Sequence, residues 1–143
     1  TYESRHTIYN MSLIIEEEKM SERYYTEDHE WVEFDQDVAT VGVSSHAVTE
    51  LGEIVFVELP DLGKVIAKGD ECASVESVKT VSGVYAPVDG EVLERNETIV
   101  ESPELINQSP YESGWLIRLK GSESFDASDL MDETAYDNYL KAI

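Results

Sequence analysis

The sequence predicts a mainly β fold, a sandwich or barrel of many short strands, with one short helix among the strands and a second helix at the C-terminal end. Three observations predict this fold. Short runs of β-branched and aromatic residues recur at close spacing, and Gly, Pro or Asp breakers separate them. Hydrophobic residues form 41% of the 143 residues, which is enough for the core of one domain. The third observation is a change to helical spacing near the end of the chain.

The predicted strands follow one another from the first tryptophan to the second. In chain order they cover residues 31–34, 38–43, 54–59, 71–77, 81–86, 90–93 and 115–119. The polar turn at 35–37 predicts a hairpin between the first two strands. Pro60 ends the third strand, and residues 68–70 and 87–90 are typical turn or breaker segments.

The short helix is predicted directly after the second strand. Ser44 and Ser45 are both candidate N-caps, and Gly52 ends the helix after Leu51. A short motif, Gly-Glu followed by two aliphatic residues, occurs at 52–55 and again at 90–93. This weak repeat suggests two related halves packed face to face.

The C-terminal helix is predicted to begin at Asp126 or Ser128. Asp129 and Asp132 would then lie in its first turn, where acidic side chains suit the helix dipole. The apolar residues near helical spacing form one face that can pack as a lid: Leu130, Met131, Ala135, Tyr139 and Leu140.

The charge balance is strongly acidic. The chain has 10 Lys and Arg against 31 Asp and Glu, a formal net charge of −21. Such a charge repels nucleic-acid phosphates and anionic lipids, so neither nucleic acid nor a membrane is an expected partner. Two interpretations of the acidity stay open: solubility of a protein present at high concentration, or steering toward basic surfaces on its partners.

The N-terminal residues differ from the rest. Residues 1–19 show no periodicity and resemble neither a secretory signal nor a basic transit peptide. We expect residues 1–10 to be added or processed, with a native start at Met11 or Met20. Residues 1–23 are therefore interpreted as an N-terminal extension, and residues 24–143 as one domain.

Catalytic and metal sites find little support in the sequence. The single cysteine, Cys72, excludes an intrachain disulfide or a Cys-rich zinc site and is interpreted as a small core residue without a redox role. His6, His29 and His46 lack metal-ligand spacing. We predict no catalytic residue and no metal.

The segment 69–90 carries the strongest candidate, Lys79. Two predicted strands meet at 78–80 without Gly, Asn, Asp or Pro. A lysine at the tip of such a hairpin is well placed for an enzyme to modify, although an ordinary solvated lysine fits the pattern too. A Schiff-base role is disfavoured, because Glu76 and the acidic chain would keep the amine protonated.

Several separated motifs, in order along residues 24–143, resemble one family, the H protein of the glycine cleavage system. They are HEWV at 29–32, VGV at 41–43, HA at 46–47, LGEIVFVELP at 51–60, VESVK at 75–79, AP at 86–87, GEV at 90–92, Asn96, Pro103, LIN at 105–107, PY at 110–111 and GW at 114–115.

The resemblance implies a lipoyl-domain-like flattened β-barrel or sandwich and lipoic acid in amide linkage to Lys79. The attachment segment would include the flanking residues Glu76, Ser77, Val78 and Thr80. Biotin carriers place the lysine between two methionines, and lipoyl domains of 2-oxo-acid dehydrogenases usually have an acidic residue before it. Val78 and Thr80 as neighbours favour the H protein.

The family's function implies a non-catalytic carrier. It would take the aminomethyl group from the pyridoxal-phosphate glycine decarboxylase to the tetrahydrofolate-dependent aminomethyltransferase. Dihydrolipoamide dehydrogenase would then reoxidise the dithiol, and lipoate-attaching enzymes would modify Lys79. By analogy, Glu30 and His46 would line a cleft for the loaded arm.

The resemblance also implies a monomer, in the bacterial cytoplasm or, in a eukaryote, the mitochondrial matrix. The N-terminal residues do not resemble a transit peptide, which favours the cytoplasm. Two alternatives stay open: an H-like protein that relays lipoyl groups to other enzymes, and an unmodified β-sandwich that binds a protein partner.

Overall fold

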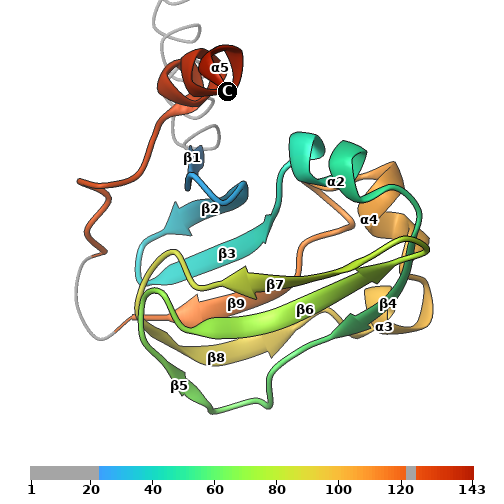
Figure 1. The fold of residues 1–143 in the computed structure, drawn as a ribbon. Helices are drawn as coiled ribbons and strands as arrows, with labels where there is room; N and C mark the ends of the chain where they lie inside the picture. The colour runs from blue at the N-terminus through green and yellow to red at the C-terminus, as the bar shows by residue number, and fades with distance from the viewer. Residues whose placement is uncertain (1–22, 122–124) are drawn as a thin grey trace, which may run out of the picture.

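The computed structural model describes residues 23–121 and 125–143. Two antiparallel sheets lie one against the other, with short helices at one end and a longer helix beyond one edge (Figure 1). The predicted mainly β sandwich is therefore confirmed. The expected starts at Met11 or Met20, and the rest of the N-terminal extension up to residue 22, lie outside the described residues.

The larger sheet has six strands in the order β1-β2-β3-β9-β8-β5. Their bounds are Arg23–Tyr25 (β1), Glu30–Asp35 (β2), Val38–Val43 (β3), Ile117–Lys120 (β9), Gly90–Arg95 (β8) and Val65–Ile66 (β5). The predicted hairpin is present, with Glu30 opposite Val43 and Asp35 opposite Val38. Only a glycine fits at position 42, because a Cβ there would lie 2.5 Å from the Trp31 ring.

The smaller sheet has three strands in the order β4-β6-β7: Ile54–Glu58, Glu71–Ser77 and Val81–Tyr85. β6 is the central strand, and its pairing with β7 aligns Glu76 with Val81 and Glu71 with Tyr85. The two copies of the short sequence repeat lead into β4 and β8, which belong to different sheets.

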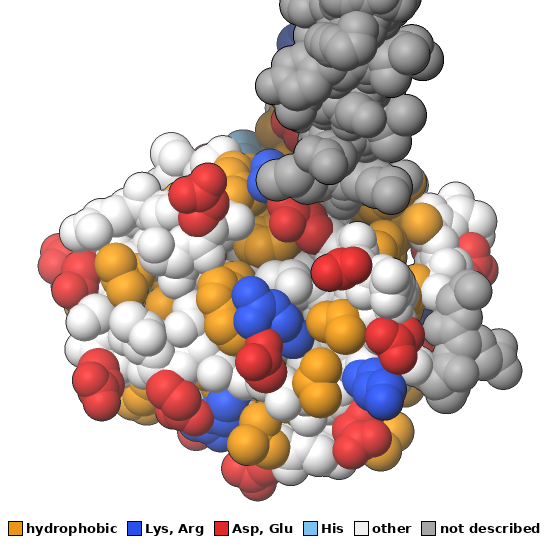
Figure 2. Space-filling view, turned by 180° about the vertical axis from the view of Figure 1, so that it is seen from behind, with side chains coloured by type: hydrophobic (Ala, Val, Ile, Leu, Met, Phe, Trp, Pro, Cys, Tyr) orange, Lys and Arg blue, Asp and Glu red, His pale blue; other side chains and the backbone are white. Residues whose placement is uncertain are grey.

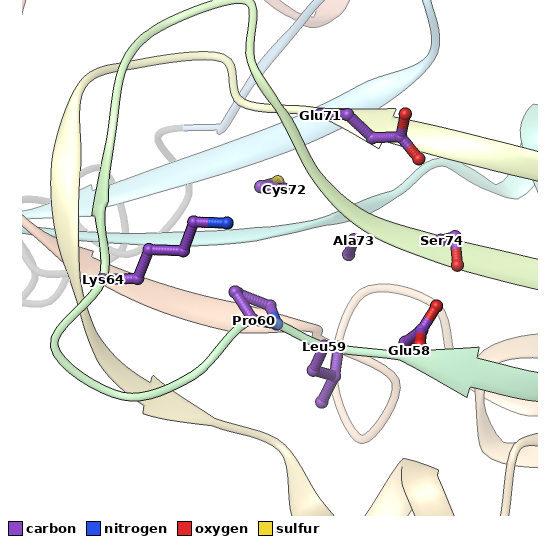
Figure 3. A pocket seen from close by; sticks show the side chains of 8 residues that line it. All are labelled: Glu58, Leu59, Pro60, Lys64, Glu71, Cys72, Ala73 and Ser74. Carbon is purple, nitrogen blue, oxygen red and sulfur yellow. The ribbon is translucent and has the colours of Figure 1, made fainter.

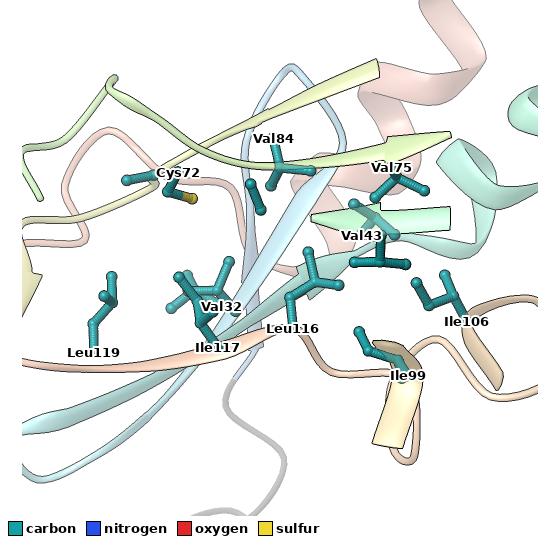
Figure 4. Close-up of a cluster of buried hydrophobic side chains, with 14 of the residues drawn as sticks. Val32, Val43, Cys72, Val75, Val84, Ile99, Ile106, Leu116, Ile117 and Leu119 are labelled. Atoms are coloured by element: carbon teal, nitrogen blue, oxygen red, sulfur yellow. The ribbon is translucent and has the colours of Figure 1, made fainter. Parts of the chain in front are cut away.

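The core fills the space between the sheets (Figure 4). Its members come from both inner faces and from three helices, and they include Val32, Val41, Val48, Val75, Val84, Ile99, Ile106, Leu116, Ile117 and Leu119. Each buried aliphatic side chain of this size stabilises the fold by about 1.5–3 kcal/mol relative to exposure. This packing fixes the strands that carry the candidate site.

Helix α2, Ser45–Leu51, lies where the sequence predicts it. Ser44 is the N-cap, since its side chain accepts a hydrogen bond from the Ala47 N–H. Gly52 ends the helix with a φ of 84°, a left-handed value that glycine adopts without strain.

Two further helices were not predicted. They are α3, Glu97–Glu101, and α4, Glu104–Gln108, and each contributes one buried isoleucine to the core. The last strand begins two residues later than predicted. Trp115 lies before it, and the Asn96 amide donates to the Trp115 carbonyl.

The predicted caps of the C-terminal helix are wrong. Helix α5 is Glu133–Ala142, and its N-cap is Asp132, which accepts from the Ala135 N–H. Asp126 instead accepts from the Ser128 N–H in a local turn. Met131 exchanges two backbone hydrogen bonds with Tyr25, and this pairing keeps residue 131 outside the helix.

Helix α5 packs on β1 rather than on the main core. Tyr136, its buried residue, stacks on Tyr25 with ring centroids 4.1 Å apart. The Tyr136 hydroxyl lies 2.8 Å from both His29 Nδ1 and Ser44 Oγ. Tyr25, Trp31 and Tyr136 form a second cluster of buried side chains, separate from the main core. Tyr139 and Leu140, which the sequence predicts on the packing face, are partly buried against it.

Candidate functional site

Lys79 lies in the turn between β6 and β7. The Ser77 N–H donates to the Thr80 carbonyl at 2.7 Å, which closes the turn. The Ser77 hydroxyl oxygen accepts from the backbone N–H groups of Lys79 at 3.2 Å and of Thr80 at 3.1 Å. Ser77 itself is only 3% exposed.

This hydroxyl explains why the turn contains no usual turn former. Among the described non-glycine residues, only His29 and Gln36 have a positive φ, so none of the turn residues 77–80 does. β-Branched residues are therefore tolerated on both sides of Lys79, and the Ser77 side chain replaces the missing backbone partner. The sequence predicts Ser77 only as a residue flanking the attachment lysine. The sequence feature that indicates its role as a hydrogen-bond acceptor for the turn is a serine two residues before Lys79.

The tip is also tied to the loop between α2 and β4. The Val78 N–H donates to the Glu53 carbonyl at 3.0 Å. A Cβ on Gly52 would lie 3.8 Å from Lys79 Cε, so the lysine side chain passes beside this glycine.

Asn107 of helix α4 holds that loop from the other side. Its Oδ1 accepts from the Ile54 N–H at 2.9 Å, and its Nδ2 donates to the Gly52 carbonyl at 2.8 Å. The amide thus fixes both ends of the segment that contacts the tip. The sequence does not reveal this role, because it does not predict helix α4, which positions Asn107.

The Lys79 side chain is exposed. No carboxylate of residues 23–121 or 125–143 forms an ion pair with its ammonium group. The structure therefore presents a primary amine on a well-held turn, which fits the attachment of an acyl group to Nζ. Glu76, three residues earlier, is exposed on the preceding strand.

Glu30 lies at the start of β2 and is only 3% exposed. One carboxylate oxygen accepts from the Thr26 hydroxyl at 2.6 Å, and the other accepts from the Tyr85 N–H at 3.0 Å. Burial raises the pKa of Glu30, and these two hydrogen bonds oppose part of that rise. The carboxylate thus links β2 to the outer strand β7, at the end of β7 away from Lys79.

His46 lies in α2 and contacts the residue before Glu30. Its ring centroid is 4.5 Å from that of His29. Burial, and then the neighbouring His46, lower the pKa of His29. The structure therefore brings His46 to the His29–Glu30 segment, but the Glu30 carboxylate turns toward Thr26 and Tyr85 rather than toward His46.

Cys72 lies at the other end of β6, seven residues before Lys79 and about 23 Å away along an extended strand. It borders a groove of about 280 Å³ together with Lys64, Pro60 and Glu71 (Figure 3). Burial raises the pKa of the Cys72 thiol to about 12, which keeps it protonated and unreactive at neutral pH.

Neither this groove nor the larger one of about 690 Å³ beside β5 and β8 is lined by Lys79, Glu30 or His46. Across the part of the chain that the structure describes, no group of three or more His, Cys, Asp or Glu side chains is arranged to hold a metal ion. No helix in these described ranges has the length and apolar character that a membrane span needs.

Comparisons with known proteins agree with one another. The sequence profile of the family described as "Glycine cleavage H-protein" matches residues 23–143. The glycine cleavage system H protein of Paramagnetospirillum magneticum is 49% identical over 124 residues, which cover 87% of this chain and 99% of that protein. That of Halothermothrix orenii is 50% identical over 119 residues, covering 83% and 93%.

A solved structure is similar in fold as well as in sequence. The crystal structure of a glycine cleavage system H protein from Mycobacterium marinum has a TM-score of 0.77 and is 34% identical to this chain. The match covers 86% of this chain and 98% of that one.

Proposed function

The chain belongs to the glycine cleavage H-protein family, and we propose on that premise that Lys79 carries lipoic acid through an amide bond to its Nζ. The observation that supports this assignment is the Lys79 turn: an exposed amine, unpaired among the described residues, on a hairpin that Ser77 and Glu53 hold in place. When bound, lipoic acid supplies a disulfide that accepts the one-carbon unit from glycine and a dithiol that is later reoxidised.

The protein's own residues supply position. The Ser77 hydroxyl and the Glu53 carbonyl hold the backbone of the tip, so that the arm starts from a defined point. Glu76, Val78 and Thr80 form the immediate surroundings that an attaching enzyme meets. Glu30 and His46 are the proposed lining of a resting cleft for the arm, beside the outer strand β7.

The proposed partners are enzymes that act in turn on one arm. They are the pyridoxal-phosphate glycine decarboxylase, the tetrahydrofolate-dependent aminomethyltransferase, dihydrolipoamide dehydrogenase and the enzymes that attach lipoate. The protein is proposed to act as a monomeric carrier without catalytic residues of its own. A cytoplasmic location is proposed too, and the bacterial origin of the compared relatives supports it.

Intact-mass measurement of the protein isolated from its native cell tests the attachment. The expected result is a mass increase of one lipoyl group that disappears in Lys79→Ala. Lys120→Ala, which removes a lysine on the other sheet, is the matched control and should keep the added mass. An unmodified Lys79 in the native protein would overturn the proposal.

Reconstitution with the purified decarboxylase tests the carrier role. Lys79→Arg should fold normally and yet support no glycine decarboxylation, because arginine accepts no lipoyl group. A lipoylated wild-type chain that is inactive here, yet donates its lipoyl group to other enzymes, would favour the relay function instead. If Lys79→Arg remained active, the lysine would have no part in the reaction.

A further inference from the structure

Apolar side chains gather on the solvent side of the three-stranded sheet, next to Lys79. The strand register aligns Phe56 of β4, Glu76 of β6 and Val81 of β7 in one row across the sheet. Phe56 is 51% exposed and Val81 is 63% exposed, so this row faces away from the core. Val78, in the turn beside Lys79, is 70% exposed.

We define the tip patch as Phe56, Val78 and Val81. Single exposed apolar residues are ordinary on a protein surface, but three at one turn, on the strands that position one lysine, indicate a contact surface. Aromatic anchors such as Phe56 carry much of the binding energy in protein interfaces when they become buried there.

The charges around the tip patch define the kind of partner. Strands β4, β6 and β7 contain Glu58, Glu71 and Glu76 but no Lys or Arg. Strands β8 and β9, in the other sheet, contain Arg95, Arg118 and Lys120 together with Glu91 and Glu94, and Arg118 forms an ion pair with Glu94. Figure 2, which views the molecule from behind, shows Lys and Arg side chains mixed with acidic ones on that face.

The two sheets therefore differ in what they offer to a partner. A partner that approaches the tip meets Phe56 and Val81 with the Glu76 carboxylate between them in the same row, and Glu58 lies two residues further along β4. Lys79 is the one cation of the turn. Amide formation on Lys79 would remove this charge. The complementary surface is an apolar entrance surrounded by Lys and Arg.

We propose that the tip patch is the surface by which the pyridoxal-phosphate glycine decarboxylase docks on this protein. The decarboxylase would contribute an active-site entrance with an apolar rim and basic residues around it. The inference rests on the proposed function, because the arm on Lys79 is what brings this enzyme to the tip. Docking there places the partner's active-site entrance directly over the residue that carries the arm. The tip patch then contributes binding, while the arm enters the enzyme.

The test measures the decarboxylase with the lipoylated chain as its varied substrate. Phe56→Ser and Val81→Ser should each raise the KM for this protein about tenfold, the effect of losing a modest interface anchor, with kcat within about twofold of the wild type. Leu93→Ser is the matched control, because Leu93 is 47% exposed on β8 in the other sheet. Phe56→Leu, which keeps the apolar contact, should restore most of the affinity.

Two further measurements separate the possible failures. Intact mass confirms equal lipoylation of every variant, so a change in KM reports docking rather than attachment. The ratio of KM between Phe56→Ser and Leu93→Ser should persist at high salt, since apolar burial is not screened. Equal KM values for these two variants would overturn the tip patch, whereas an inactive wild-type protein would overturn the proposed function itself.

Discussion

At the scale of single residues, Glu30 shows how burial and hydrogen bonding act on one carboxylate. It is nearly inaccessible, yet each oxygen accepts a hydrogen bond, from Thr26 and from the Tyr85 backbone. Its position in the HEWV motif identifies it in the sequence, but its partner on β7 lies 55 residues away. Only the fold brings the two together.

Removing the Glu30 carboxylate should destabilise the protein. In Glu30→Ala the Tyr85 N–H loses its acceptor, and the loss of one such hydrogen bond costs about 0.5–1.5 kcal/mol of unfolding free energy. Glu30→Gln retains an acceptor for Tyr85 and should lose less. Urea unfolding of both variants measures the difference, and equal losses would contradict this role of the oxygen.

The pKa of Glu30 also predicts how the stabilities of wild type and Glu30→Gln change with pH. Burial raises this pKa above its ordinary value of 4.5, so the folded state binds the proton more tightly than the unfolded state. The stability that this group contributes is complete below 4.5 and is lost as the pH rises through the raised pKa. The stability of Glu30→Gln relative to wild type should therefore increase with pH across that window; a constant difference would contradict the shift.

At the scale of elements, the Lys79 turn depends on a loop and a helix that lie far from it in the sequence. The Val78 N–H bonds to the Glu53 carbonyl, and Asn107 bonds to the backbone on either side of Glu53. Helix α4 therefore supports the tip through the loop between α2 and β4. The position of Lys79 is a property of three elements together.

The variant Asn107→Ala should loosen the tip. It removes two hydrogen bonds to the backbone, which costs about 1–3 kcal/mol, and hydrogen exchange at the Val78 amide should become faster. Asn107→Asp keeps the acceptor for Ile54 and should have an intermediate effect. Gln108→Ala, at an exposed neighbouring position of α4, is the control. Unchanged exchange at Val78 in Asn107→Ala would show that the loop holds without the amide.

The sequence predicts the elements whose signals are local. The hairpin of β2 and β3, helix α2 with its Ser44 cap, and strands β4, β6 and β7 all lie where alternation and breakers indicate them. Helices α3 and α4 have five residues each, too short for a helical period to be detected, so they were missed. The start of α5 was wrong because Met131 pairs with Tyr25, more than a hundred residues away in the chain.

The candidate site follows the same division between local and distant signals. Lys79 and its neighbours are contiguous in the sequence, so the motif locates them. The contacts of Glu30 and Asn107 join segments more than 50 residues apart, and no local pattern reveals such contacts.

At the scale of the whole molecule, charge is unevenly distributed over an acidic protein. The net charge is −21, yet the strands behind the Lys79 sheet carry several of the few arginines and lysines. Strands β4, β6 and β7 contain glutamates and no Lys or Arg, so the small sheet offers a basic partner carboxylates without neighbouring strand cations. This asymmetry gives steering a direction, which a uniform charge for solubility lacks.

Association kinetics distinguish steering from solubility. If the acidic sheet steers the protein toward a basic partner, the association rate constant with the decarboxylase should fall steeply as salt is added, while dissociation changes little. Stopped-flow mixing at several ionic strengths measures both rates. A rate constant independent of salt would leave solubility as the role of the acidity.

The Glu30–Tyr85 hydrogen bond has a consequence for the behaviour of many copies of this protein together. β7 is an outer strand of its sheet, and outer strands offer backbone groups to which a strand of another molecule can add. The buried Glu30 carboxylate accepts a hydrogen bond from one of these groups, the Tyr85 N–H. A strand of a second molecule that extended the sheet at Tyr85 would have to displace this carboxylate, which disfavours edge-to-edge pairing at that position.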